Sequence, residues 1–119
     1  MNFTNLLTKH PLNNGVMAQF LSKSGNIKFS VIGGEHFYST PRENVSREEF
    51  TEFEVALFDA NTNNWASYNQ AKPVFEIFNS KGEYQTIDFE DNPIDLNKSQ
   101  NAVFGYIPKE AIEKAWEIL

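Results

Sequence analysis

The sequence contains no cysteine, two histidines, and 10 basic residues against 16 acidic ones. Without cysteine the chain has no disulfide framework, no thiolate metal site and no thiol nucleophile. The net charge of −6 disfavours direct nucleic-acid binding, because affinity for phosphates comes from Lys and Arg. No run of 18 apolar residues occurs, and residues 1–12 show no signal-peptide pattern. We therefore predict no membrane association and a cytoplasmic location.

The chain does contain enough apolar residues for a folded core. Hydrophobic residues make up 40% of the sequence, and 11 Phe, 4 Tyr and 2 Trp are spread along it. Intrinsically disordered chains lack such residues, and a chain of this length fits one domain. Because neither an internal repeat nor a Gly/Ser-rich linker divides the sequence, residues 1–119 are expected to form a single domain.

Apolar and polar residues alternate along several segments, which is typical of half-buried β-strands. Phe53, Val55 and Leu57, for example, alternate with Glu54 and Ala56. Turn-forming residues at 23–26 and 79–82 are expected to close two hairpins, of which the second is the clearer. The predicted strands lie at residues 16–22, 27–32, 53–57, 65–68, 74–78, 83–89 and 102–107.

After Pro108 the apolar residues change to a helical period. Two shorter helical segments are also indicated: one up to residue 10, ended by the following proline, and one turn at residues 46–49, which have capping-box spacing. The predicted class is α+β, with one domain, a mostly antiparallel sheet of about five to seven strands and a C-terminal α-helix. The apolar stripe of that helix is formed by Ala111, Ile112, Ala115, Trp116 and Leu119.

His36 has the best case for a catalytic role. It lies in a glycine-led loop with Ser39, Thr40 and Arg42, so that a base, hydroxyls and a cation are close in sequence. No nucleophile elbow, P-loop or His-Glu-x-x-His motif accompanies it, and a loop histidine packed beside aromatic residues explains the same pattern. A small hydrolase using His36 is therefore the third hypothesis, and we predict no catalytic residue and no cofactor.

Residues 59–70 copy only the first half of a calcium-binding loop. Asp59, Asn61 and Asn63 have the spacing of its first ligands, but Asn64 and Gln70 stand where such a loop has Gly and Glu. One carboxylate supplies little charge for the ion, whereas Asp and Asn in turns bond their own backbone. We predict a turn here and no metal site.

Acidic residues gather in two parts of the sequence. Residues 43–59 hold six acids against Arg47 alone, and residues 83–95 hold five acids without Lys or Arg. If the strands in these segments are neighbours, their outward faces form one acidic patch that attracts a basic partner. A solvated sheet face kept soluble by like charge accounts for the same pattern. The strand residues expected to contact the partner are Glu52, Glu54, Tyr84, Asp88, Glu90 and Asp91.

The loop at residues 35–42 is a second candidate contact surface. Tyr, Phe and Arg anchor interfaces because they bury much area for little lost freedom. His36, Tyr38 and Arg42 are therefore also predicted to contact a partner. Alternatively, Phe37 and Tyr38 simply cover a sheet edge.

Two stretches resemble small uncharacterised proteins of bacterial phages and prophages: Val31-Ile32-Gly33-Gly34 with Tyr38-Ser39-Thr40-Pro41-Arg42, and Glu54-Val55-Ala56-Leu57-Phe58. The resemblance brings no catalytic residue with it. Small, acidic, cysteine-free phage proteins are similar in style to inhibitors of host defence such as anti-CRISPR and anti-restriction proteins. By analogy, the resemblance implies an inhibitor of a host protein.

The leading hypothesis is thus a non-enzymatic, acidic protein-binding module. It would occupy a basic, nucleic-acid-facing groove of a host defence protein, as an anti-CRISPR-like inhibitor from a phage or mobile element. The alternative is a structural or assembly subunit of a phage particle or larger complex. That alternative predicts self-association through a strand edge or through the face of the C-terminal helix that carries Trp116.

Overall fold

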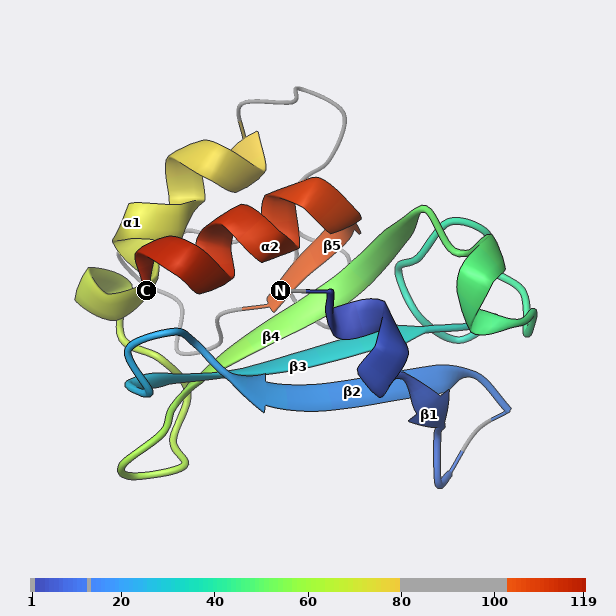
Figure 1. Cartoon of the computed structure of the whole chain (residues 1–119), viewed down its shortest axis with the longest axis horizontal. Helices are drawn as coiled ribbons and strands as arrows, with labels where there is room; N and C mark the ends of the chain where they lie inside the picture. The colour runs from blue at the N-terminus through green and yellow to red at the C-terminus, as the bar shows by residue number, and fades with distance from the viewer. Residues whose placement is uncertain (1, 13, 80–102) are drawn as a thin grey trace.

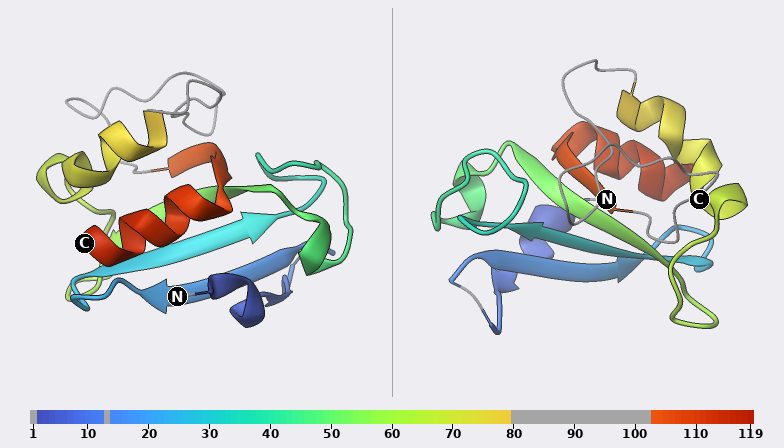
Figure 2. Two further views of the ribbon diagram at one scale, coloured as in Figure 1. Left: turned by 45° about the horizontal axis from the view of Figure 1, so that its top comes forward. Right: turned by 180° about the vertical axis from the view of Figure 1, so that it is seen from behind.

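In the part of the chain that the structure describes, five antiparallel β-strands form one sheet in the order in which they occur in the sequence, and two α-helices lie on one face of it (Figures 1 and 2). The computed structural model describes residues 2–12, 14–79 and 103–119. The predicted α+β class, with an antiparallel sheet and a C-terminal helix, is confirmed. The elements are η1 (Phe3–Leu6), β1 (Thr8–Lys9), β2 (Val16–Leu21), β3 (Ile27–Gly33), η2 (Arg47–Glu49), β4 (Glu52–Asp59), α1 (Tyr68–Asn79), β5 (Val103–Pro108) and α2 (Lys109–Ile118), where η marks a 3₁₀-helix.

The two central strands follow the predicted alternation. In β4, Phe53, Val55 and Leu57 are fully buried, and their register places Val55 opposite Val31 and Leu57 opposite Phe29 of β3. Because side chains alternate between the two faces of a strand, these apolar residues all face the helices. The predicted β2–β3 hairpin is also confirmed, since Ser22 N–H donates to Ile27 O at 2.7 Å across its turn.

Phenylalanine rings fill the space between the sheet and the helical elements. The ring centroids of Phe3 in η1 and Phe53 in β4 lie 5.3 Å apart, and the two rings meet edge to face. Phe78 of α1 meets Phe104 of β5 in the same manner at 4.9 Å. Such pairs contribute about 1 kcal/mol each beyond the area that they bury. From α2 the predicted stripe enters this core: Ala111, Ile112 and Ala115 are buried, and Trp116 and Leu119 pack against it.

The largest difference from the predicted elements concerns residues 74–78. They were expected to form a strand, but they lie in α1. Ser67 and Gln70 explain why a helix begins here: Gln70 N–H donates to Ser67 Oγ at 3.2 Å, and Ser67 N–H donates to Gln70 Oε1 at 2.9 Å. This reciprocal pair is a capping box, which satisfies donors at a helix start. The partner strand predicted at 83–89 lies outside the described residues.

Two smaller predictions are wrong. Residues 65–68 do not form a strand: the backbone pairing of Trp65 with Phe58 is an isolated bridge, and Tyr68 already begins α1. The short helix expected up to residue 10 is a 3₁₀-helix that covers only Phe3–Leu6, and Thr8 and Lys9 then pair with β2. In both places, contacts with the sheet override the local preference of the sequence.

Candidate functional site: the loop between β3 and β4

The connection between β3 and β4 is unusually long for two neighbouring antiparallel strands. Hairpin connections usually need about two to five residues, whereas here residues 34–51 lie between the two strands. We call this segment the 34–51 loop. It includes η2 and projects from one end of the sheet (right side of Figure 1). Long ordered loops on a rigid sheet are common sites of recognition.

Ser39 fixes the fold of the 34–51 loop from within. Its side chain is buried, and its Oγ accepts from Gly34 N–H at 3.0 Å. The same oxygen lies 2.9 Å from Pro41 O, within hydrogen-bond distance. Gly34 has a φ of 152°, and a Cβ there would meet the Asn44 side chain at 2.9 Å. Glycine is thus required at the point where the loop leaves β3.

The loop is also fastened to β4. Thr40 N–H donates to Glu52 O at 3.0 Å, and Thr51 N–H donates to Thr40 O at 2.9 Å. The Thr40 hydroxyl donates to the Glu52 carboxylate at 2.5 Å. Glu52 is consequently half-buried. Its carboxylate helps to position the loop as well as adding charge to the surface.

Tyr38 joins the loop to the far edge of the sheet. Its N–H donates to Glu54 Oε1 at 3.3 Å, and its carbonyl accepts from Tyr106 N–H of β5 at 3.0 Å. The two tyrosine rings meet edge to face with centroids 5.9 Å apart. Arg42 lies over the Tyr38 ring, 4.9 Å from its centroid, in a cation–π arrangement. We call Tyr38, Arg42, Glu54 and Tyr106 the tyrosine cluster.

Burial changes the acidity of Glu54 within this cluster. Removal of the carboxyl from water raises its pKa to about 7, against the opposing effect of the Arg42 charge. Near neutral pH, Glu54 is therefore only partly ionised. It contributes less negative charge to the surface than the sequence alone indicated.

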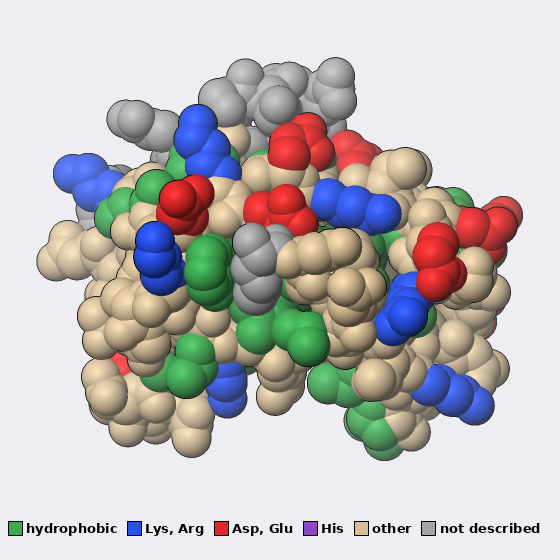
Figure 3. Space-filling model, viewed as in Figure 1, with side chains coloured by type: hydrophobic (Ala, Val, Ile, Leu, Met, Phe, Trp, Pro, Cys, Tyr) green, Lys and Arg blue, Asp and Glu red, His purple; other side chains and the backbone are tan. Residues whose placement is uncertain are grey.

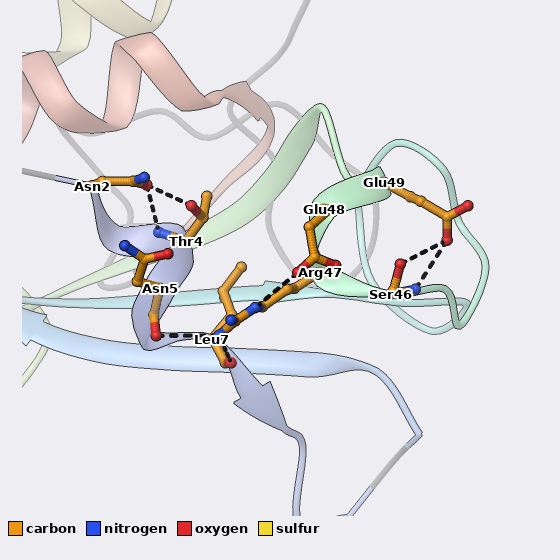
Figure 4. Close-up of polar contacts among 8 residues, drawn as sticks. All are labelled: Asn2, Thr4, Asn5, Leu7, Ser46, Arg47, Glu48 and Glu49. Atoms are coloured by element: carbon orange, nitrogen blue, oxygen red, sulfur yellow. Dashed lines mark hydrogen bonds and ion pairs between the residues drawn. The ribbon is translucent and has the colours of Figure 1, made fainter.

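Arg47 ties the other end of the loop to the N-terminal segment (Figure 4). Its Nη1 donates to Asn5 O at 3.2 Å and to Leu7 O at 3.4 Å, and its Nε donates to Glu48 at 3.2 Å. The capping box predicted at residues 46–49 is confirmed in part by Glu49, whose carboxylate accepts from Ser46 N–H and Ser46 Oγ, both at 3.1 Å. The guanidinium of Arg47 is thus engaged in holding the loop in place.

The outward surface of the 34–51 loop carries most of its charge. Glu35, His36, Arg42, Glu43 and Glu48 are exposed, and acidic and basic side chains lie side by side at this end of the molecule in Figure 3. His36 Nε2 lies 3.2 Å from the Glu35 carboxylate, and 63% of the His36 side chain is exposed. The hydroxyls of Ser39 and Thr40 bond to other groups, as described above. Among the described residues, neither hydroxyl is bonded to His36.

The structure brings together five of the predicted contact residues: Glu52, Glu54, His36, Tyr38 and Arg42 all belong to the 34–51 loop or to the start of β4. The other four, Tyr84, Asp88, Glu90 and Asp91, lie outside the described residues. Sequence reasoning missed Tyr106, which it treated only as part of the last strand. Tyr106 has a φ of 57°, next to a register shift between β4 and β5 opposite residues 53–55. The signal that could have found it is the glycine before Tyr106, because glycine inside a strand often marks a bulge.

The predicted turn at residues 59–64 is confirmed, and the carboxylate of Asp59 accepts hydrogen bonds from its neighbours. Asp59 Oδ1 accepts from Asn61 N–H at 2.8 Å and from Thr62 N–H at 3.1 Å, and Oδ2 accepts from the Gln70 amide at 2.6 Å. These bonds, that of Gln70 first, lower the pKa of Asp59. Within the described ranges, no group of three His, Asp or Glu side chains is arranged to hold a metal ion.

Compared with protein families, with curated proteins and with solved structures, the chain matches none of them. The resemblance to phage proteins therefore stays a prediction. Among the described residues, the helices are too short and too polar to cross a bilayer.

Proposed function

We propose that this protein is a non-enzymatic binding module that docks on a basic surface of another protein, with the 34–51 loop at the centre of the contact. The main support is the construction of that loop. It is far longer than the strand connection requires, it is held by hydrogen bonds to β4, β5 and the N-terminal segment, and its outward side chains are charged. A pre-ordered loop binds at a low entropic cost.

The charge balance of the loop supports a basic partner. The 34–51 loop holds four glutamates and two arginines, so its formal charge is negative. One of the arginines, Arg47, is also engaged with main-chain oxygens. The whole chain has a net charge of −6. Complementary charge of this kind raises the rate of association more than it lowers the rate of dissociation. Tyr38 and Arg42 supply an aromatic and a planar cationic group beside the acids, which suits an interface anchor.

The partner we propose is a host protein with a basic, nucleic-acid-facing groove, as expected from the phage-like stretches. Both stretches contribute to the described site: residues 38–42 of the first lie in the loop, and residues 54–58, which are the second, lie in β4. A ligand that fills a nucleic-acid groove must carry negative charge, because the groove is built for phosphates. The acids of the 34–51 loop provide that charge on a fixed scaffold.

Affinity capture with charge-reversed variants tests this proposal. The tagged protein is used to capture partners from a bacterial lysate, the co-purifying protein is identified, and its binding rates are measured on a biosensor. The loop variant Glu35→Lys/Glu43→Lys is compared with the control Glu113→Lys/Glu117→Lys on α2, which changes the net charge equally. We expect the loop variant to slow association at least about tenfold at low salt, and the control to have a smaller effect.

Equal binding by the two variants would contradict the loop as the contact surface. Capture of further copies of the chain alone would instead favour the assembly alternative. The assembly alternative predicted self-association through the α2 face that carries Trp116. That side chain is half-buried within the chain, and its Nε1–H donates to Leu21 O of β2 at 2.8 Å. Sedimentation at increasing concentration measures any self-association directly.

A further inference from the structure

The carboxyl group of Glu54 lies where the 34–51 loop meets the sheet. In β4, Glu54 stands between Phe53 and Val55, at the register shift with β5. Tyr38 of the loop contacts both sides of this irregularity, since its N–H donates to Glu54 Oε1 and its carbonyl accepts from Tyr106 N–H of β5. A single loop residue thus connects the carboxyl group to the last strand. Irregularities of this kind in a sheet are common next to functional sites.

The surroundings of Glu54 suit a protonated carboxyl better than an ionised one. Among the described residues, its one hydrogen bond comes from Tyr38 N–H at 3.3 Å, whereas an ionised carboxylate has sites for about four. Ile32 lies directly opposite on β3 and presents a half-buried apolar side chain. A carboxylate that loses water without gaining hydrogen bonds is costly to ionise. The closed loop therefore favours the neutral form of this side chain.

The charged groups around Glu54 do not compensate for this loss of water. In the described part of the chain no ion pair joins Glu54 to a basic residue, because Arg42 lies over a tyrosine ring of the loop instead. Glu52, on the same face of β4, is itself acidic. From β3 and β5 the neighbours are Ile32 and Tyr106 rather than a base. Burial thus dominates and raises the pKa of Glu54 to about 7, although the Arg42 charge acts in the opposite direction.

We propose that Glu54 is a pH-sensitive switch of the 34–51 loop: the protonated carboxyl keeps Tyr38 in contact with β5, and ionisation of Glu54 releases Tyr38 from β5. When Tyr38 moves away, water reaches the carboxylate, so the open form accommodates the charge that the closed form disfavours. The rest of the loop stays in place, because Thr40 is bonded to β4 and Ser39 to Gly34 independently of Glu54. An effect on partner binding rests on the function proposed above, in which this loop is the contact surface, whereas the switch itself does not.

Amide hydrogen exchange followed by NMR tests the proposal on the protein alone. The protection factor compares the exchange rate of an amide with that of an unstructured peptide at the same pH, and for Tyr106 it reports how often its N–H leaves Tyr38 O. We expect this factor to fall at least about tenfold between pH 5 and pH 8. Linkage limits the fall to about 70-fold for a carboxyl whose pKa is about 7 in the closed form and 4.5 in the open form. Lys23 N–H, bonded to Trp116 O away from the loop (left side of Figure 1), should keep a constant factor.

Two variants separate the switch from other effects of pH. Glu54→Gln cannot ionise but keeps an acceptor for Tyr38 N–H, so the protection factor of Tyr106 should be the same at pH 5 and pH 8. Glu52→Gln changes the net charge equally and should keep the wild-type fall. If Glu54→Gln does not fold, the wild-type fall is compared with the titration of the Glu54 carboxyl followed by carbon-13 NMR, and it must level off above the midpoint of that titration.

The proposal is overturned if the protection factor of Tyr106 does not fall in the wild type, if the fall persists in Glu54→Gln, or if Glu52→Gln abolishes it. A parallel loss of protection at Lys23 would also overturn it, because the whole protein rather than the loop would then respond to pH. Failure to capture a partner changes none of these exchange rates and would contradict only the proposed function.

Discussion

Tyr106 N–H donates to Tyr38 O at 3.0 Å, and this bond joins the 34–51 loop to the last strand of the sheet. The backbone of Tyr106 has a φ of 57°, a left-handed conformation that costs about 1–2 kcal/mol for a residue other than glycine. The ring of Tyr106 recovers part of that cost through its edge-to-face contact with Tyr38. A local irregularity in β5 thus positions the loop that we propose as the contact surface.

Glu54→Gln should change how stability depends on pH. In the folded protein the pKa of Glu54 is raised to about 7, whereas in the unfolded chain it is 4.5. Between these values the folded state binds the proton and the unfolded state does not, so the free energy of unfolding falls as pH rises from 4.5 to 7. The total effect is on the order of 3 kcal/mol. Glutamine removes it, and the variant should be more stable than the wild type at pH 8.

Urea unfolding at several pH values measures this effect. Glu52→Gln on the same strand is the control, since it changes the net charge equally and keeps an oxygen for the Thr40 hydroxyl. Parallel curves for the wild type and Glu54→Gln between pH 4.5 and 7 would show that burial of Glu54 does not govern its titration.

Gly33→Ala should destabilise the start of the 34–51 loop. A Cβ at this position would lie 2.9 Å from two ring carbons of Phe50, which is fully buried. Overpacking of this kind typically costs about 1–3 kcal/mol. The comparison is Gly25→Ala in the β2–β3 turn, where nothing lies within 4 Å but φ is 81°. That change should cost about 1 kcal/mol from the backbone alone, and thermal unfolding distinguishes the two. A Gly33→Ala variant as stable as the wild type would mean that Phe50 can move aside.

Ser67→Ala should weaken the start of α1. The Ser67 hydroxyl accepts from Gln70 N–H, and loss of such a cap costs about 1 kcal/mol. Urea unfolding measures the loss, with the neighbouring exposed Asn69→Ala as a control that leaves the cap in place. If residues 74–78 formed a strand, as their apolar pattern suggested, Ser67→Ala would not be destabilising relative to that control.

Trp116→Phe should loosen the contact between α2 and β2. The indole Nε1–H donates to Leu21 O at 2.8 Å, and Lys23 N–H donates to Trp116 O at 3.1 Å. Phenylalanine keeps most of the apolar area but leaves the Leu21 carbonyl without its donor, at a cost of about 1 kcal/mol. Amide exchange at Lys23 should become faster, and an unchanged exchange rate would show that the main-chain bond alone holds this end of α2.

The sequence determined the elements in which local pattern and burial agree. Phe53, Val55 and Leu57 alternate with polar residues and are buried as a set, because one face of a strand repeats every second residue. The same holds for Ala111, Ile112 and Ala115 on one side of α2. Asp59 was expected to bond its own turn, and it does, because that bond depends only on the next few residues.

Tertiary structure decided what depends on neighbours distant in the chain. The apolar residues at 74–78 fit a strand or a helix equally, and the cap at Ser67 together with the packing of Phe78 on Phe104 selects the helix. Glu54 has the sequence pattern of a solvated acid, yet its pKa depends on burial beside Tyr38 and Arg42, which only the folded loop brings to it. The charge of a residue and the period of a segment can be read from the sequence alone, whereas the burial that shifts a pKa exists only in the folded protein.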